Sequence, residues 1–436
     1  MRCARYGHGT QETFRSLELE VTKSLLKLAS LAAVSSLLLS ACAEAPMTTS
    51  SSPAGSLPAS SAAGSATAGA GDFKACMVSD FGGFDDKSFN ETSYKGLLQA
   101  KEQLGVETAQ IESKEESEYA RNVQSMIDAK CGVIVTVGYA LANATEAAAK
   151  QNPNVKFAIV DNESFEGVDN AKGLIFDTAQ PAFMAGYVAA SLTQTGKVGT
   201  FGGDKYPTVR IFMDGFAQGV EHYNQTKGKS VQVLGWDRAT KDGQFIGGAS
   251  PFDDNAGGKN TANTLIAQGA DIILPVAGPS GLGALDAVKE TNGKVNAIWV
   301  DTDGYVSAPE YKDVIITSIV KSMDVAVLDV IKAAKEGSFS SDPYVGTLKN
   351  KGVDLSEFHD FDSKVSAETK SELEQIRATG QALIAQSTPD EGSRVKGVSA
   401  FSGAINLSIM IGSLISSGLG AWWIFAPVHA TPWFIA

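Results

Sequence analysis

The fold is decided by the stretch Asp80-Phe81-Gly82-Gly83-Phe84-Asp85-Asp86-Lys87-Ser88-Phe89-Asn90, which directly follows the apolar run 75–79. The run predicts a buried β-strand. The stretch ends that strand with a carboxylate, makes a glycine turn, and then presents an aromatic and an amide side chain. Ligand sites in open α/β sheets lie beyond the carboxyl ends of strands, so the stretch predicts a small-molecule pocket.

Apolar, β-branched runs alternate with helical patterns along the whole core. A first series has predicted strands at 75–79, 133–137 and 157–160, and predicted helices at 93–104 and 141–150. A second series has predicted strands at 197–201, 231–234, 271–275 and 297–300, and predicted helices at 207–223, 257–268 and 282–291. Repeated βα units indicate parallel sheets. The sequence therefore predicts an α/β protein of two lobes, in which each lobe is a parallel sheet flanked by helices and a hinged cleft lies between them.

The lobes are expected to exchange segments of chain. We assign residues 72–180 and about 315–340 to the N-terminal lobe, and residues 181–314 and about 341–387 to the C-terminal lobe. The strand 315–321 and the helix 324–336 are one unit too many for the second lobe, so both are expected to cross back to the first. A last pattern, 368–383, predicts a polar surface helix.

The N-terminal region has the pattern of an export signal. Two lysines precede an apolar run that is too short to span a bilayer and that ends at Leu39-Ser40-Ala41-Cys42. Residues 1–41 are therefore interpreted as a signal peptide, with 1–20 as a gene-model extension, and Cys42 as a lipidated first residue. The alternative is a short buried helix with a free Cys. The predicted location is the extracytoplasmic face of the cell membrane.

Two further segments lie outside the predicted lobes. Residues 42–71 are rich in Ala, Ser, Gly and Thr and predict a flexible linker behind the lipid anchor. Residues 388–436 form an apolar tail, and from 397 onward it has no Lys, Arg, Asp or Glu. This tail is interpreted as a gene-model artefact, a second membrane anchor, or a segment packed on the lobes, and the sequence leaves the choice open.

Composition excludes several classes of function. With 36 Lys and Arg against 49 Asp and Glu, the formal net charge is −13, so a nucleic-acid partner is not expected. The four histidines lie far apart, and no G-x-S-x-G or H-E-x-x-H motif is present, so we expect no metal, no cofactor and no enzymatic reaction. The glycine-rich runs 196–203 and 278–283 lack the spacing of nucleotide-binding loops. A monomer is expected.

Cys76 begins the first predicted strand, and Cys131 precedes the strand 133–137. In a doubly wound lobe these strands would be neighbours. A disulfide between the two cysteines is the hypothesis for an exported protein, and two separate buried thiols are the alternative.

The motif D-x-G-G-x-D-D-K-S-F-N at residues 80–90 resembles the opening motif of the basic membrane protein family, bacterial lipoproteins that are purine-nucleoside-binding components of ABC importers. The resemblance ends near residue 386. It implies the two-lobed, type I fold of periplasmic binding proteins and a nucleoside ligand. It also implies ABC permease and ATPase subunits as partners. A sugar or another small ligand on the same scaffold is one alternative, because the fold alone does not determine which ligand binds. A secreted nucleoside-processing enzyme with Asp80, Asp85 and Asp86 as metal ligands is another, although Asp85 and Asp86 fit better as a turn and helix start.

The faces of a purine need aromatic partners. Phe89 and Phe252 lie in predicted loops rather than on the periodic face of a helix, and the family motifs point to the same two positions. Core packing is the alternative for either ring, and Phe245 is a rival to Phe252.

The polar edge and the ribose need hydrogen-bonding partners. Asp80 and Asp161 each end a predicted strand of the first lobe, and Asn90 lies nearby; a helix cap or a turn is the alternative role for each Asp. Asp301 ends the last strand of the second series. Lys321 interrupts an apolar run, where an unpaired charge is costly, so an ion pair with Asp301 or a contact with a sugar oxygen is expected. The resemblance implies that Asp301 and Lys321 bind the sugar. Gly278, in a turn that opens a helix, is expected to offer a backbone contact.

Overall fold

The computed structural model of the chain describes residues 73–379. The predictions on the signal peptide, on Cys42, on the linker and on the tail all lie outside the described residues. Within the described range, no helix combines the length and the apolar character that crossing a membrane requires.

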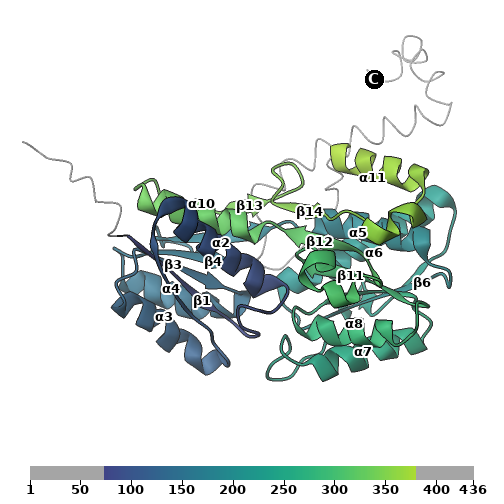
Figure 1. Cartoon of the computed structure of the whole chain (residues 1–436), viewed down its shortest axis with the longest axis horizontal. Coiled ribbons are helices and arrows are strands. Elements are labelled where there is room, and N and C mark those ends of the chain that lie inside the picture. Colours follow the sequence, from purple (N-terminus) through teal and green to yellow (C-terminus); the bar gives the residue numbers. More distant parts are fainter. Residues whose placement is uncertain (1–72, 380–436) are drawn as a thin grey trace, which may run out of the picture. The chain divides into compact units, whose positions relative to one another are not determined.

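The first lobe is a six-stranded sheet with the order β13-β5-β4-β3-β1-β2, and every pairing in it is parallel. Its strands are β1 (Lys74–Ser79), β2 (Glu107–Ile111), β3 (Val133–Val137), β4 (Lys156–Val160), β5 (Ala171–Phe176) and β13 (Tyr344–Gly346). Its helices are α2 (Phe89–Leu104), α3 (Tyr119–Asp128), α4 (Ala142–Gln151) and α10 (Met323–Lys335). Figure 1 shows α2 and α10 over one face of the sheet and α3 and α4 over the other. Because both faces are covered, β1, β3 and β4 are almost continuously buried and mostly apolar instead of alternating between apolar and polar residues.

The second lobe is a six-stranded sheet with the order β14-β12-β11-β10-β6-β7, in which β14 alone pairs antiparallel. Its strands are β6 (Lys197–Gly202), β7 (Gln232–Leu234), β10 (Ile272–Val276), β11 (Asn296–Asp301), β12 (Ile315–Lys321) and β14 (Val353–Leu355). Its helices are α5 (Ala179–Leu192), α6 (Pro207–Lys227), α7 (Asn255–Ala267), α8 (Ser280–Lys289), the short α9 (Gly304–Ser307) and α11 (Ala367–Thr379). Two helix-flanked, mainly parallel sheets confirm the predicted α/β class.

The chain crosses between the sheets after β5, after β12 and between β13 and β14. Strand β12 pairs with β11 and stays in the second sheet, so the placement of residues 315–321 in the N-terminal lobe was wrong. Only α10 crosses back, where it packs on α2. Strand β13 joins β5 in the first sheet, although residues from 341 onward had been assigned to the C-terminal lobe. An apolar strand pattern reports burial but does not specify the neighbouring strand, which is why both segments were misplaced.

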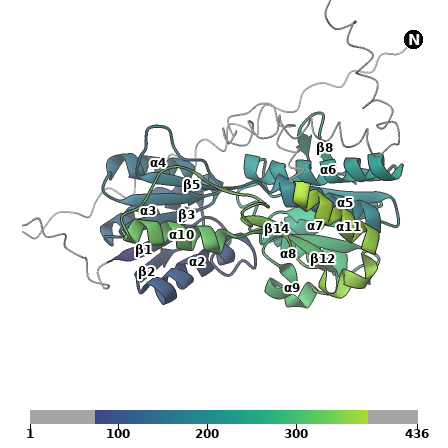
Figure 2. The ribbon, with the colours of Figure 1, turned by 90° about the horizontal axis from the view of Figure 1, so that it is seen from above.

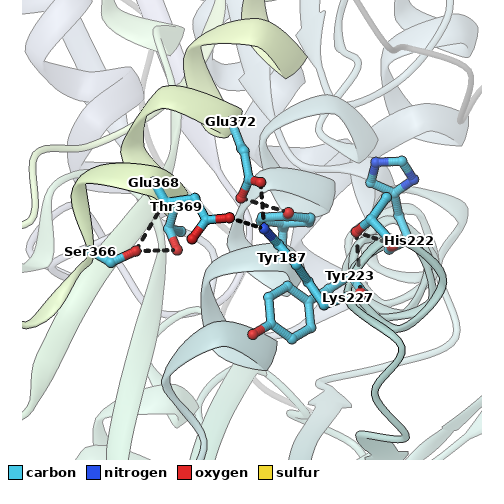
Figure 3. A network of polar contacts seen from close by, with 9 residues as sticks. Tyr187, His222, Tyr223, Lys227, Ser366, Glu368, Thr369 and Glu372 are labelled. Carbon is cyan, nitrogen blue, oxygen red and sulfur yellow. Dashed lines mark hydrogen bonds and ion pairs between the residues drawn. The ribbon is translucent and has the colours of Figure 1, made fainter. Parts of the chain in front are cut away.

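Helix α11 lies beside α5 (Figure 2). It is polar, as its sequence pattern predicted, but part of it is buried. Leu373 and Ile376 are buried in the core of the second lobe. Figure 3 shows the polar contacts that accompany this packing. Lys227 at the end of α6 donates to Glu372 at 2.5 Å, and the Tyr187 hydroxyl of α5 donates to the same carboxylate at 2.8 Å. Burial, together with this bond, raises the pKa of Tyr187 to about 12. Helix α11 is thus attached to both α5 and α6.

Cys76 in β1 and Cys131, which precedes β3, form a disulfide with a Cα–Cα distance of 5.9 Å. Both residues are buried, and β1 and β3 are parallel neighbours.

The bond predicts a specific labelling pattern. When the chain is unfolded without reductant and treated with an alkylating reagent, the peptides that contain Cys76 and Cys131 should remain unmodified, and both should become modified once reductant is added. Mass spectrometry of the digested protein measures this. Alkylation of both peptides before reduction would show two free thiols instead.

Candidate functional site

A pocket lies between the two lobes and is lined by residues of both. About 550 Å³ of empty space lies within it, and part of that space is open to solvent. The structure brings all of the predicted ligand-binding residues to its wall: Asp80, Phe89, Asn90, Asp161, Phe252, Gly278, Asp301 and Lys321. Their contacts with a ligand stay a prediction.

Lys321, the last residue of β12, is a buried cation with two carboxylate partners. Its Nζ lies 2.8 Å from Asp161 Oδ2 and 3.2 Å from Asp301 Oδ1. Burial by itself would lower the pKa of Lys321, but the two carboxylates outweigh it and raise that pKa. Burial raises the pKa of Asp161, and the charge of Lys321 opposes this effect. The sequence had suggested Asp301 as an ion-pair partner; Asp161, which comes from the other lobe, was not expected in that role.

Both of these aspartates have left-handed backbone conformations. Asp161 follows β4 with φ +64°, and Asp301 ends β11 with φ +72°. Residues other than glycine adopt this region uncommonly, although Asp tolerates it better than most. Strained backbone conformations of this kind are found mainly at functional sites, where contacts with the surrounding structure stabilise them. Here they turn two strand-terminal carboxylates toward one lysine.

Aromatic rings line the pocket from both lobes. Phe89 is the first residue of α2, and the Lys321 Nζ lies 4.6 Å from the centroid of its ring. Phe252, in the loop before α7, lies 5.7 Å from the ring of Tyr206, which in turn is 5.1 Å from that of Tyr139 in the first lobe. The rival Phe245 is not part of the pocket wall.

Several lining residues were missed from sequence, among them Tyr139, Tyr206 and Phe212. Tyr139 follows the end of β3 by two positions, and Tyr206 lies between β6 and α6. Both could have been found by the rule that ligand sites lie beyond the carboxyl ends of strands. Phe212 lies within α6, where its helical spacing indicated only core packing.

Asn90 and Asp80 form the polar part of the first-lobe wall. The Asn90 amide donates to Asp80 Oδ1 at 3.1 Å and to the Phe81 carbonyl at 2.8 Å, which leaves its buried Oδ1 without a hydrogen bond. Burial raises the pKa of Asp80 to about 8; the bond from Asn90 lowers it, and the nearby Asp86 and Asp161 raise it further. At neutral pH the Asp80 carboxyl therefore carries a proton and can donate a hydrogen bond.

Gly138 allows Asp80 to take this position. A Cβ at residue 138 would lie 1.9 Å from Asp80 Oδ2, and the backbone there has φ +115°. Both conditions require glycine.

Asp86 organises the turn before α2. It accepts hydrogen bonds from the backbone N–H groups of Ser88, Asn90 and Glu91, so its predicted role at the helix start is confirmed. Asp85 is exposed. In the part of the chain that the structure describes, no group of three or more His, Cys, Asp or Glu side chains is placed to hold a metal ion. The alternative metal site at Asp80, Asp85 and Asp86 is thus not assembled.

Asp80 should make the stability of the protein depend on pH. Between its ordinary pKa of 3.8 and its raised value of about 8, the folded chain retains a proton that the unfolded chain releases, so the free energy of unfolding falls as pH rises through this window. Asp80→Asn cannot ionise and should reduce the fall between pH 5 and pH 8 by at least about 1 kcal/mol, the equivalent of roughly one pKa unit. Urea unfolding without ligand at both pH values measures this, with Asp85→Asn as the exposed control. Equal pH slopes in Asp80→Asn and the wild type would contradict the assignment.

Two α/β sheets joined by three crossings, with a pocket between them, form the two-lobed fold of the periplasmic binding proteins. The family model described as ABC transporter substrate-binding protein PnrA-like matches residues 73–382, and the chain belongs to this family. The match spans both lobes and every predicted pocket residue.

Individual relatives agree with this assignment. Basic membrane protein A of Borreliella burgdorferi is 33% identical over 254 residues, which cover 57% of this chain and 68% of the relative. The ABC transporter nucleoside-binding protein BmpA of Lactococcus lactis is 30% identical over 301 residues, 65% of this chain and 81% of the relative. Among solved structures, an ABC transporter solute-binding protein from Aeropyrum pernix covers 80% of this chain and 98% of its own, with a TM-score of 0.64 and 24% identity. This last similarity shows the fold.

Proposed function

We propose that this chain captures purine nucleosides and delivers them to the permease and ATPase subunits of an ABC importer, while held at the extracytoplasmic membrane surface by a lipid on Cys42. The observation that carries the proposal is the combination, in one pocket, of Phe89 and Phe252 with the Asp161–Lys321–Asp301 ion pairs. Rings suit the faces of a base, and charged groups suit a sugar diol. A relative named as a nucleoside-binding protein supports the same ligand class.

The base would stack on the aromatic rings. Phe89 comes from the first lobe and Phe252 from the second, so a base in contact with both would join the lobes. Stacking of a base on an aromatic side chain is worth about 1–3 kcal/mol. The larger ring system of a purine gains more from this contact than a pyrimidine does.

The edge of the base would pair with Asp80 and Asn90. A protonated Asp80 donates, and Asn90 Oδ1 accepts. Adenine and hypoxanthine each present one donor beside one acceptor on the Watson–Crick edge, so either would match. Pairing there would also satisfy the buried Asn90 oxygen, whose desolvation is otherwise uncompensated.

The ribose would bind at Asp301 and Lys321. Lys321 lies within ion-pair distance of Asp301 Oδ1, but this buried oxygen accepts no hydrogen bond. Asp301 Oδ1 is therefore available to accept a hydrogen bond from a sugar hydroxyl. Lys321 can donate to a sugar oxygen with its remaining protons. Gly278, with φ +51°, would offer its backbone at the second-lobe wall.

The charges of the pocket favour an uncharged ligand. Among its described lining residues, four carboxyl groups accompany one cation: Asp80, Asp86, Asp161, Asp301 and Lys321. Lys321 is already paired with Asp161 and Asp301, so a phosphate would meet no available cation and would lie near these two negative charges. Nucleosides are therefore expected to bind and nucleotides to be rejected.

Titration calorimetry of the full chain tests the proposal, with adenosine, guanosine, inosine, cytidine, uridine, AMP, ribose and glucose as ligands. Binding of purine nucleosides, with weak or absent binding of AMP, ribose and glucose, is the expected result. Preferred binding of glucose or ribose would overturn the nucleoside assignment. We expect intact nucleoside to be recovered after prolonged incubation, since the proposal is capture without reaction; release of free base would contradict it.

A further inference from the structure

Ser88 of the first lobe contacts the second lobe with its side chain. Its hydroxyl donates to Asp301 Oδ2 at 2.9 Å and lies 3.3 Å from the carbonyl of Val300. Ser88 and Asp301 are both buried. A hydroxyl has one proton to donate, and the shorter contact to a charged acceptor is the stronger of the two.

The position of Ser88 makes this contact unusual. Ser88 is the N-cap residue of α2, where a serine side chain normally accepts a hydrogen bond from a backbone N–H of the first helical turn. Here the Ser88 side chain makes no such bond. Asp86 accepts from the N–H groups of Asn90 and Glu91 instead, so the Ser88 hydroxyl can act as a donor to the other lobe.

The backbone around Ser88 is held firmly. Its N–H donates to Asp86 Oδ1 at 2.9 Å, and its carbonyl accepts from the Thr92 hydroxyl at 2.7 Å. A second hydrogen bond between the lobes lies next to that of Ser88: the Lys87 carbonyl accepts from the indole N–H of Trp299 in β11 at 3.3 Å. Residues 87–88 thus dock on the end of β11, which carries Asp301.

We propose that Ser88 is a positioning residue and an inter-lobe latch: its hydrogen bond holds the lobes in the ligand-binding arrangement and orients the Asp301 carboxylate so that Oδ1 faces Lys321 and the ligand. The ligand part of this inference rests on the proposed function. The latch itself is a contact within the chain and can be tested without any ligand.

The Ser88–Asp301 hydrogen bond and the ligand both stabilise the arrangement in which the two lobes are in contact. The Ser88–Asp301 bond exists only while the two lobes are in contact, and a ligand held by both lobes needs the same arrangement. Each therefore stabilises the state that the other requires. Without the hydroxyl, Asp301 Oδ2 loses a buried donor, and its carboxylate is held less firmly.

Ser88→Ala is a clean test because the side chain does not cap α2. Ser93→Ala is the matched control: Ser93 is buried in the same helix, but its hydroxyl donates to the Phe89 carbonyl and does not contact Asp301. Hydrogen–deuterium exchange of the full chain without ligand should be faster in Ser88→Ala at residues 87–91 and 300–304, on both sides of the contact. In Ser93→Ala, residues 300–304 should exchange as in the wild type.

The affinity for a purine nucleoside should fall roughly tenfold in Ser88→Ala, through faster dissociation, as expected for the loss of a hydrogen bond to a charged group. Unchanged exchange at 300–304 in Ser88→Ala would overturn the latch, whatever the ligand result. Faster exchange at 300–304 with unchanged affinity and dissociation rate would overturn the positioning role. If the wild type bound no nucleoside, the proposed function would fail, and the exchange experiment would still decide the latch.

Discussion

Lys321→Met should lower the free energy of unfolding by about 3–5 kcal/mol, the cost typical of removing one partner from a buried ion pair. The substitution leaves Asp161 and Asp301 buried in the pocket without their shared cation. It should also weaken nucleoside affinity at least about a hundredfold, because a charged donor is lost and Asp301 is no longer held in place. Urea unfolding and titration calorimetry measure the two effects.

A second variant separates stability from binding. Lys321→Met combined with Asp161→Asn and Asp301→Asn removes all three buried charges, so no unpaired charge is left in the pocket, whereas Lys321→Met by itself leaves two. We expect the free energy of unfolding to return close to the wild-type value while nucleoside affinity stays lost. The exposed Lys332→Met, in α10, is the control for the loss of a lysine and should change neither quantity. Wild-type affinity in Lys321→Met would eliminate the proposed sugar site.

Phe89→Ala should weaken nucleoside binding by about 2 kcal/mol, or roughly thirtyfold, through the loss of base stacking. The ring is half-buried at the pocket wall, and the Lys321 ammonium lies 4.6 Å from its centroid. Phe89→Leu keeps much of the apolar volume but has no π face. Its free energy of unfolding should therefore lie close to that of the wild type, while its affinity for a nucleoside should stay low, as in Phe89→Ala. Titration calorimetry with inosine measures the loss of affinity.

Phe165→Ala is the matched control for Phe89→Ala. Phe165 packs partly buried on the core of the same lobe and does not line the pocket. Phe165→Ala should lower the free energy of unfolding without changing the affinity for a nucleoside. Equal affinity losses in Phe89→Ala and Phe165→Ala would mean that the first acts through folding rather than through stacking.

Much of the site was predictable because the carboxyl ends of parallel strands meet at one edge of each sheet. Asp80, Asp161 and Asp301 each end or follow an apolar run, and all three line the pocket. Glycines in the motif at residues 80–90 marked a turn, and an isolated lysine in an apolar segment required a charged partner. Each of these signals is local in sequence, so no knowledge of the other lobe was needed.

Contacts between distant segments were decided by the tertiary structure alone. The apolar pattern of β12 predicts a buried strand whichever sheet it joins, and only its pairing with β11 puts it in the second lobe. Helix α11 is polar in composition, yet Leu373 and Ile376 find an apolar surface on the second-lobe core. In both cases the periodicity of the sequence indicates which residues are buried, but not which other helix or strand they pack against.

By itself, the sequence determined the α/β class, the two series of βα units and the residue types at the strand ends, because these depend on local periodicity and turn chemistry. The tertiary structure alone decided that Asp161 shares Lys321 with Asp301, and that Ser88 donates to Asp301 of the other lobe instead of capping its own helix. These pairings join residues from different lobes. They depend on how the two sheets face each other, which arises from the packing of the whole chain and has no signature at any single position.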